Sequence, residues 1–303
     1  MTSTLHPKVS VVIPTYNRAG DVVRAVRSAL SQTIPPHQVI VVDDGSTDDT
    51  EAVVKALPAP VVYVRKDNGG VSSARNLGFQ HVTGDFVALL DSDDQWEARW
   101  LEVATLAVQR HPGAGAALST RVWIVGPDGT KLRLRQLKGR SIDGLMPLEQ
   151  LMEGGAMGSN LLIRTSVLRQ VGDFDATLKT GEDIDYALRL VATASIVSVE
   201  EPLVLVTHSV VSLSKSIDTG NRLRVYDKFE RLFPELAAEH KVILRQSRAN
   251  ATLGYALDLT VDRQLAKARS RAVESWRYQP SFAAAKQLGK IALLQVAKRF
   301  SGA

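Results

Sequence analysis

Four short apolar runs are spaced through the first ninety residues, and each ends at polar or charged residues. Unbroken runs of this length are typical of strands that are buried on both faces of a sheet. Between the first two runs, Val22, Val26 and Ala29 recur at helical spacing, and the pattern stops before Pro35. Strand, helix and strand in that order predict a parallel sheet with right-handed crossovers. The predicted strands are Val9–Pro14, Val39–Val42, Val61–Val64 and Phe86–Leu90.

Three carboxylates follow the last of these runs. Parallel strands end on one edge of a sheet, so the polar residues after all four runs should converge on one crevice, where open α/β sheets bind ligands. Asp91, Asp93 and Asp94 would repel one another there, and a divalent cation bound by carboxylate and phosphate oxygens relieves such repulsion. The alternative is an Asx-rich turn without a metal. Asp91 and Asp93 are therefore a candidate metal–diphosphate site.

The pattern is weaker beyond the fourth run. It predicts a helix over residues 101–108, a strand over Ala116–Val125 and a hairpin turn at Pro127–Gly129. The basic stretch Lys131–Arg140 is interpreted as a mobile loop that either closes over the phosphates of a ligand or is simply a solvated surface. A further helix is predicted where apolar residues return at helical spacing, at Ile184, Ala187, Leu188 and Val191.

The chain changes character near residue 215. Residues 1–214 carry 20 Lys and Arg against 24 Asp and Glu, whereas residues 215–303 carry 17 against 8, a net charge of +9. The later part is predicted to be helical, which gives two domains, 1–214 and 215–303. Its basic residues have no interleaved aromatics or nucleic-acid motif, so a nucleic-acid partner is not expected, and peripheral contact with an anionic membrane is the alternative to a solvated exterior. The predicted helices are Ala251–Leu259, Ala266–Trp276 and Ser281–Phe300.

Composition limits the class of protein. The chain has 303 residues, of which 45% are hydrophobic and 23% charged, which is typical of a globular protein with a large core. The absence of cysteine excludes disulfides, thiolate zinc sites and cysteine nucleophiles. Residues Met1–Lys8 lack the features of a signal peptide, and no run is apolar for long enough to span a membrane. We therefore expect a cytoplasmic protein, with the inner face of the cell membrane as a peripheral location.

Several phosphate- and ion-binding motifs are absent. There is no P-loop and no Gly-x-Gly-x-x-Gly after the first predicted strand, and the acids after the fourth lack the glycine and distal glutamate of an EF-hand. ATPase, dehydrogenase and calcium-sensor functions are therefore disfavoured.

The chain instead resembles family 2 glycosyltransferases of the GT-A fold in a series of ordered segments. The likeness covers roughly residues 9–214, and each segment alone would be weak. The segments are Val-Ile-Pro-Thr-Tyr-Asn-Arg (12–18), Val-Val-Asp-Asp-Gly-Ser-Thr-Asp (41–48), Asn-Gly-Gly-Val-Ser-Ser-Ala-Arg-Asn (68–76), Leu-Asp-Ser-Asp-Asp (90–94), Gly-Ser-Asn-Leu-Leu-Ile-Arg (158–164), Val-Gly-Asp-Phe-Asp (171–175) and Gly-Glu-Asp-Ile-Asp-Tyr-Ala-Leu-Arg-Leu (181–190).

The resemblance implies an α/β GT-A fold and transfer of a sugar, with inversion, from a nucleotide diphosphate donor of UDP or dTDP type to a saccharide or lipid-linked saccharide acceptor. It implies Mn²⁺ or Mg²⁺ as cofactor, with Asp91 and Asp93 as ligands, and Asp183 as the general base. Glu182, Asp185 and Trp96 would contact the acceptor. The implied donor-binding residues are Pro14, Thr15, Tyr16, Arg18, Asp43, Asp44, Asn68, Gly70, Arg75, Asp91 and Ser92.

Some of these roles have ordinary structural alternatives. His208 stands where many relatives have Tyr-Arg-x-His, but the tyrosine and arginine are replaced here, so it is either a metal or diphosphate ligand or a structural histidine. Tyr16 could be a half-buried aromatic residue, Asp44 a turn or cap residue, and the acids near Asp183 could simply favour the helix dipole.

Other functions also stay open. The absence of Gln-x-x-Arg-Trp argues against a processive synthase. A sugar nucleotidyltransferase should show a Gly-x-Gly-x-Arg loop after the first strand, where this chain has Pro-Thr-Tyr-Asn-Arg. A non-catalytic sugar-nucleotide binding protein would not need Asp183.

Overall fold

The computed structural model describes residues 7–136, 144–148, 151, 158–208 and 219–301. The backbone divides into two compact units, residues 1–177 with 186–212, and residues 178–185 with 213–303. The division differs from the expected 1–214 and 215–303 chiefly in the segment Leu178–Asp185, which belongs to the second unit. The first unit is an α/β structure, and the second unit is helical, with all its helices in its later segment except the first turn of α7 (Glu182–Thr193).

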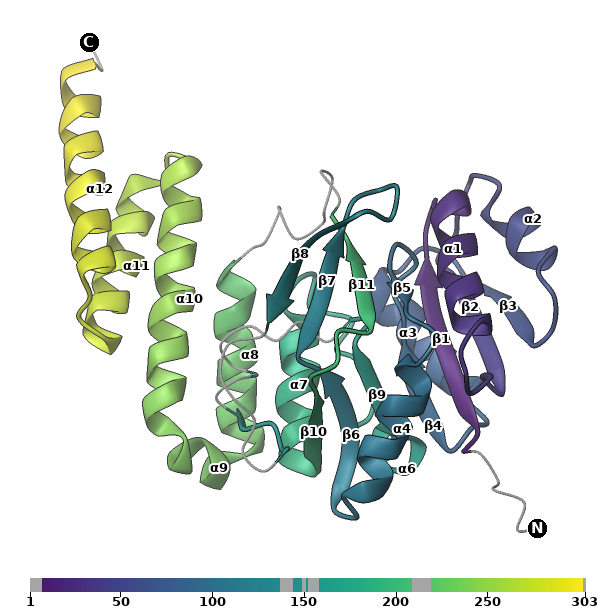
Figure 1. The fold of residues 1–303 in the computed structure, drawn as a ribbon. Helices are drawn as coiled ribbons and strands as arrows, with labels where there is room; N and C mark the ends of the chain where they lie inside the picture. The colour runs from purple at the N-terminus through teal and green to yellow at the C-terminus, as the bar shows by residue number, and fades with distance from the viewer. Residues whose placement is uncertain (1–6, 137–143, 149–150, 152–157, 209–218, 302–303) are drawn as a thin grey trace. The chain divides into compact units, whose positions relative to one another are not determined.

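A seven-stranded sheet in the order β10-β6-β9-β4-β1-β2-β3 forms the centre of the first unit (Figure 1). The four strands predicted from the apolar runs are mutually parallel, as expected, and β9 is antiparallel to both of its neighbours. The strands are β1 (Val9–Thr15), β2 (Gln38–Asp43), β3 (Val61–Arg65), β4 (Phe86–Leu89), β6 (Ala114–Ser119), β9 (Leu161–Arg164) and β10 (Ser195–Val199).

Alternate residues of each central strand enter two different cores. Val11 and Ile13 of β1 pack with α1 (Ala19–Leu30), α2 (Thr50–Lys55) and α4 (Trp100–Arg110). On the opposite face, Val12 packs with helices α3 (Val71–Gln80), α6 (Thr165–Val171) and the part of α7 (Glu182–Thr193) that begins at Tyr186. Helices thus cover both faces of the sheet, which is why its strands are apolar without alternation.

A second sheet, in the order β5-β11-β7-β8, corrects two predictions. Residues 116–125 contain parts of two strands in different sheets, β6 and β7 (Arg121–Val125). The N–H of Thr120 still donates to the carbonyl of Val199 in the first sheet, and the chain then enters the second sheet. Residues Lys131–Gln136, expected in a mobile loop, form β8, which pairs with β7 across the predicted hairpin turn. All of β8 is exposed, so it gives no burial signal in the sequence. Residues 137–140 of that predicted loop lie outside the described residues. The other strands are β5 (Gln95–Trp96) and β11 (Val204–Thr207).

The second unit contains five helices among the described residues after 218. Helices α10 (Lys241–Val261) and α11 (Leu265–Tyr278) both extend beyond their predicted ranges, Ala251–Leu259 and Ala266–Trp276. Ala256, Ala268, Ala272 and Ile291 form a buried core between the last three helices. No helix of the described residues is long and apolar enough to cross a bilayer. The helices are α8 (Thr219–Leu232), α9 (Pro234–Glu239), α10 (Lys241–Val261), α11 (Leu265–Tyr278) and α12 (Phe282–Ser301).

Candidate functional site

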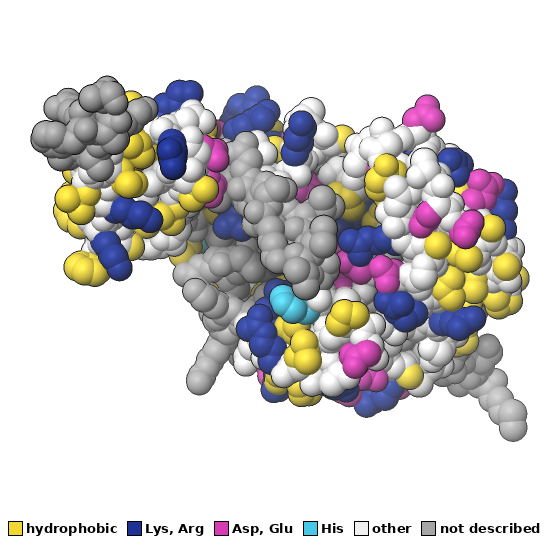
Figure 2. Space-filling model, turned by 90° about the horizontal axis from the view of Figure 1, so that it is seen from above, with side chains coloured by type: hydrophobic (Ala, Val, Ile, Leu, Met, Phe, Trp, Pro, Cys, Tyr) yellow, Lys and Arg dark blue, Asp and Glu magenta, His cyan; other side chains and the backbone are white. Residues whose placement is uncertain are grey.

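The carboxyl ends of β1, β2 and β4 bring the predicted donor-binding segments of the first unit to one edge. Thr15 and Asp43 are partners in the register of β1 and β2, and the N–H of Asp44 donates to the carbonyl of Thr15. Figure 2 looks down on the molecule from above the view of Figure 1, and it shows acidic side chains set among Lys and Arg side chains on this face. The convergence expected from the sequence is therefore present.

The two carboxylates of the candidate metal site each face an arginine. Arg75, which is buried, lies 2.7 Å from Asp91 Oδ1, and Arg18 lies 2.5 Å from Asp93 Oδ2. Burial raises the pKa of Asp93, Asp91 raises it further, and the positive charge of Arg18 opposes both. The pair is therefore charge-compensated and held in place by the protein itself.

Asp91 and Asp93 fit the chemistry of a magnesium or manganese site. Both offer carboxylate oxygens, and both side chains are partly exposed. A cation of this kind is commonly held by one or two carboxylates together with substrate phosphates. Within the part of the chain that the structure describes, no group of three His, Asp or Glu side chains could hold a metal, so the exposed His208 does not complete such a set. The remaining ligands would have to come from the diphosphate.

Gly158 lies directly against this site. A Cβ at position 158 would be only 2.5 Å from Asp91 Oδ2, closer than real Cβ contacts. A side chain at residue 158 would therefore displace this carboxylate.

Asp94 connects this loop to the second sheet, a role that the sequence did not reveal. It is 6% exposed, accepts a hydrogen bond from Ser159 Oγ at 2.5 Å, and accepts another from the N–H of Thr207 at 2.9 Å. The same Ser159 hydroxyl accepts the N–H of Asp91 at 2.9 Å. Burial, and then repulsion by Asp91 and Asp93, raise the pKa of Asp94 to about 8. Asp94 thus fixes the position of the metal-site carboxylates and does not itself face the crevice.

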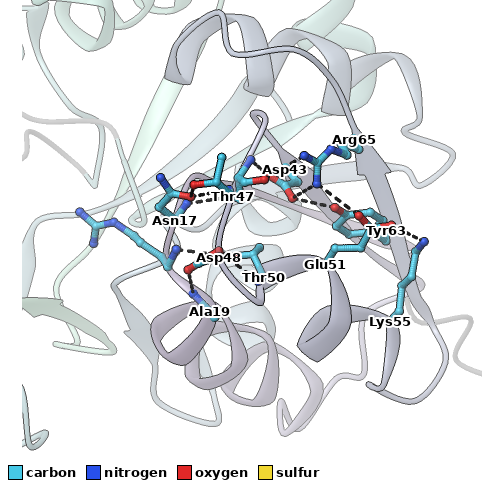
Figure 3. Close-up of polar contacts among 12 residues, drawn as sticks. Asn17, Ala19, Asp43, Thr47, Asp48, Thr50, Glu51, Lys55, Tyr63 and Arg65 are labelled. Carbon is cyan, nitrogen blue, oxygen red and sulfur yellow. Dashed lines mark hydrogen bonds and ion pairs between the residues drawn. The ribbon is translucent and has the colours of Figure 1, made fainter.

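Asp43, the predicted partner of the nucleotide, is wholly buried in a hydrogen-bond network (Figure 3). Its Oδ1 accepts the N–H of Ser46 at 2.7 Å, and its Oδ2 accepts the hydroxyl of Tyr63 at 2.6 Å, with Arg65 at 3.6 Å. Burial and the hydrogen bond to Asp43 raise the pKa of Tyr63 to about 12. Tyr63 and Arg65 were not expected at the site, and they fix the orientation of the Asp43 carboxylate.

A second set of contacts in Figure 3 joins the loop after β1 to the loop after β2. The N–H of Asn17 donates to Ser46 Oγ at 2.8 Å, and Asn17 Oδ1 accepts the N–H of Thr47 at 2.7 Å. Asn17 has a φ of +50°, a conformation that asparagine tolerates better than most residues. The turn leaves Tyr16 47% exposed. An exposed ring at this position is free to stack on a base.

Asp44 shapes the glycine turn. Its two carboxylate oxygens accept the N–H groups of Gly69 and Gly70 at 2.9 and 2.7 Å, and Lys66 Nζ lies 2.7 Å away. Gly70 has a φ of +87°, which favours glycine. Asp44 is itself only 4% exposed, so its contribution to the site is to hold this turn in place. Asn68 and Gly70, which belong to the turn, are exposed.

Three other residues that were predicted to bind the donor or the acceptor are buried within the first unit. Pro14 and Ser92 are buried, and Trp96 is 4% exposed, with its indole N–H donating to the carbonyl of Ser159. Trp96 also packs beside Trp100 in the core. Its burial gives it a packing role, and we do not carry it into the proposal for acceptor binding.

The predicted catalytic base lies in the first turn of α7, within the second unit. Asp183 is half-buried, and its Oδ1 accepts the N–H of Ile184 at 2.8 Å. Asp185 is 3% exposed and forms an ion pair with Lys228 at 2.9 Å, so it is a structural residue and not an open acceptor ligand. Glu182 is half-buried.

Comparison with known proteins decides the family. Residues 10–172 match the model of the family described as Glycosyl transferase family 2. The chain belongs to this family. The resemblance inferred from the ordered segments is thereby confirmed.

Known proteins that are similar in sequence to this family 2 glycosyltransferase include other glycosyltransferases. The chain is 28% identical over 253 residues to the uncharacterized glycosyltransferase RP339 of Rickettsia prowazekii, covering 80% of this chain and 76% of that protein. It is 34% identical to the succinoglycan biosynthesis protein ExoO of Rhizobium meliloti, covering 58% of this chain and 53% of that protein. Some relatives are much longer: the matched region spans 29% of an uncharacterized glycosyltransferase of Rickettsia bellii.

Solved structures confirm the GT-A fold of this family 2 glycosyltransferase. S. aureus TarS residues 1–349 in complex with UDP-GlcNAc superposes with a TM-score of 0.73 and 20% identity, covering 97% of this chain and 92% of that one.

Proposed function

We propose that the protein is an inverting, non-processive glycosyltransferase that moves a sugar from a UDP or dTDP donor to a hydroxyl of a saccharide or lipid-linked saccharide. The convergence of Tyr16, Asp43 and the Asp91–Asp93 pair on one sheet edge carries the donor assignment. The UDP-GlcNAc complex of TarS supports a nucleotide-sugar donor, and the likeness to ExoO supports polysaccharide synthesis as the setting.

We propose a pyrimidine nucleotide for the donor, as the resemblance to the family implies. The exposed ring of Tyr16 offers a stacking surface for its base. Asp43 is wholly buried with both carboxylate oxygens already paired, so we assign it the role of fixing the end of β2 where the base would lie. Arg75 would lie beside the phosphates.

The proposed reaction is a single displacement. Asp183 takes the proton of the acceptor hydroxyl while the oxygen attacks the anomeric carbon from the face opposite the diphosphate. Arg18 and Arg75 are held next to the carboxylates where the diphosphate would leave, and their positive charge would stabilise it. A divalent cation held by Asp91 and Asp93 would neutralise part of the same charge.

We further propose that the second unit makes peripheral contact with an anionic membrane surface on the cytoplasmic side. Its later segment, residues 215–303, has a net charge of +9, and several apolar side chains of its helices are exposed. Figure 2 shows hydrophobic side chains interspersed with Lys and Arg on these helices. Basic residues and inserted apolar side chains add to one another at such a surface. The exposed side chains include Val242, Val261, Phe282 and Leu293.

A donor panel tests the enzymatic proposal. The full chain is incubated with UDP-, dTDP- and GDP-sugars, and release of the nucleoside diphosphate is measured with excess chelator and after Mn²⁺ or Mg²⁺ is restored. We expect release from a UDP- or dTDP-sugar, loss of release on chelation, and recovery with the metal. Full activity in excess chelator would refute the metal site, and preference for a GDP-sugar would refute the pyrimidine assignment. Asp91→Asn is the matched variant and should weaken metal-dependent donor binding.

A further inference from the structure

The helical unit contains a pocket of about 390 Å³ that none of the donor-site residues lines. Side chains of α8, α10 and α11 form its walls, and these three helices lie side by side in Figure 1. The lining is polar: it includes three arginines, two tyrosines, two acids and an asparagine. The lining residues used below are Asn221, Arg224, Asp227, Arg248, Tyr255, Arg271, Glu274 and Tyr278.

Two of the arginines are fixed by neighbouring carboxylates. Arg248 is 8% exposed, and its guanidinium donates to Asp227 and to Glu230 at 2.8 Å each. Arg271 donates to Glu274 at 2.7 Å, and its guanidinium lies 5.5 Å from the centre of the Tyr255 ring. These pairs place fixed donors and acceptors side by side around a half-buried aromatic ring.

Other polar groups of the pocket have bonding capacity to spare. Among the described residues, Arg224 makes no ion pair, and its one hydrogen bond is to Asn221 Oδ1 at 3.5 Å. The hydroxyls of Tyr255 and Tyr278 make no hydrogen bond within that same part of the chain. Arg248 and Arg271 are thus paired with carboxylates, whereas the exposed Arg224 has no carboxylate partner for its positive charge among the described residues.

We propose that this pocket binds an acidic sugar residue of the acceptor. A sugar has an apolar C–H face that can pack on a tyrosine ring, and hydroxyls that both donate and accept hydrogen bonds, as the mixed lining does. The planar guanidinium of Arg224 suits a single carboxylate or phosphate group by two parallel hydrogen bonds. A neutral sugar would leave that charge without a partner. The assignment of the ligand as part of the acceptor rests on the proposed glycosyltransferase function.

Binding of three probes to the full chain tests the inference. Methyl β-D-glucuronide and glucose 6-phosphate carry a carboxylate and a phosphate, respectively, and methyl β-D-glucoside is the neutral counterpart. Affinities are measured by saturation-transfer NMR at constant ionic strength, with inorganic phosphate as the anion without a sugar. We expect at least one acidic sugar to bind about tenfold more tightly than both the glucoside and inorganic phosphate, and the comparison of the two acidic probes identifies the preferred acid group.

Matched variants assign the binding to the pocket. Arg224→Gln should reduce the affinity for the acidic sugar to that for the glucoside. Tyr255→Leu should lower the affinity for both the acidic sugar and the glucoside. Arg231→Gln, on the same helix α8 and also exposed but outside the pocket, should change neither. Equal binding of the glucoside, equal binding of inorganic phosphate, or an unaffected Arg224→Gln variant would overturn the inference. Donor turnover is assayed separately on the same samples, so failure of this site and failure of the proposed enzymatic function are distinguishable.

Discussion

Replacing Gly158 with alanine should weaken donor binding while the protein stays folded. The new Cβ would stand 2.5 Å from Asp91 Oδ2, whereas ordinary contacts begin at 3.4 Å, so the carboxylate has to move by about 0.9 Å. Its other oxygen is held by Arg75 at 2.7 Å. The movement therefore strains an ion pair as well as a side chain.

The magnitude follows from the size of that movement. Inserting one methyl group into a close-packed position costs about 1–3 kcal/mol, and the lower part of that range applies because a carboxylate at the end of a side chain can turn. A magnesium ligand belongs at about 2.0–2.1 Å from the ion in near-ideal octahedral geometry, so a shift of this size disrupts the coordination. We expect a loss of donor affinity of about 5- to 30-fold, since the lower part of that range is about 1–2 kcal/mol and about 1.4 kcal/mol corresponds to tenfold.

Calorimetry of UDP binding with and without Mn²⁺ measures this effect, and the thermal midpoint Tm of each variant reports folding. Gly289→Ala is the matched control, because a Cβ there meets nothing within 4 Å and alanine favours a helix. It should leave affinity unchanged and Tm the same or slightly higher. An unchanged affinity in Gly158→Ala, whatever its Tm, would refute the reasoning that Asp91 binds the donor through a metal in this position.

Three other outcomes are expected. Asp183→Asn should reduce turnover by about 10²- to 10⁴-fold while donor affinity persists, and near-native turnover at saturating substrates would show that Asp183 is not the base. Because the pKa of Asp94 is raised from 3.8 to about 8, the folded protein keeps a proton that the unfolded chain has lost, so its stability should fall as pH rises from about 4 to about 8, by up to about 1.4 kcal/mol per pH unit. Urea unfolding across this range should show that decline in the native protein and a flatter profile in Asp94→Asn; equal slopes would contradict it. Phe282→Ser with Leu293→Ser should reduce flotation with anionic vesicles at low salt, whereas Leu106→Ser in the first unit should not, and undiminished flotation of the double variant would exclude a contribution from these side chains.

The sequence by itself determined the parallel strands of the first unit and the motifs that follow them, because both are patterns of residues close together along the chain. Apolar runs such as Val39–Val42 and Phe86–Leu90 are typical of strands whose two faces are both buried in a sheet. The helices between these runs predict that the strands are parallel, as they are in the structure. The ordered motifs that follow those strands then predicted the family, which was confirmed. Local pattern failed at Lys131–Gln136, where an exposed strand carries no burial signal.

Tertiary structure alone decided what the individual carboxylates do. Asp91, Asp93 and Asp94 are near neighbours in sequence, yet Asp91 and Asp93 face arginines at the crevice, and Asp94 is buried against Ser159 and Thr207. Likewise, Asp43 and Asp44 are adjacent, but one is fixed by Tyr63 and the other shapes the turn at Gly70. The partners lie from 16 to 113 residues away along the chain. Periodicity constrains only residues within a few turns or along one strand, so burial and pairing at such separations are set by how the sheets and loops pack.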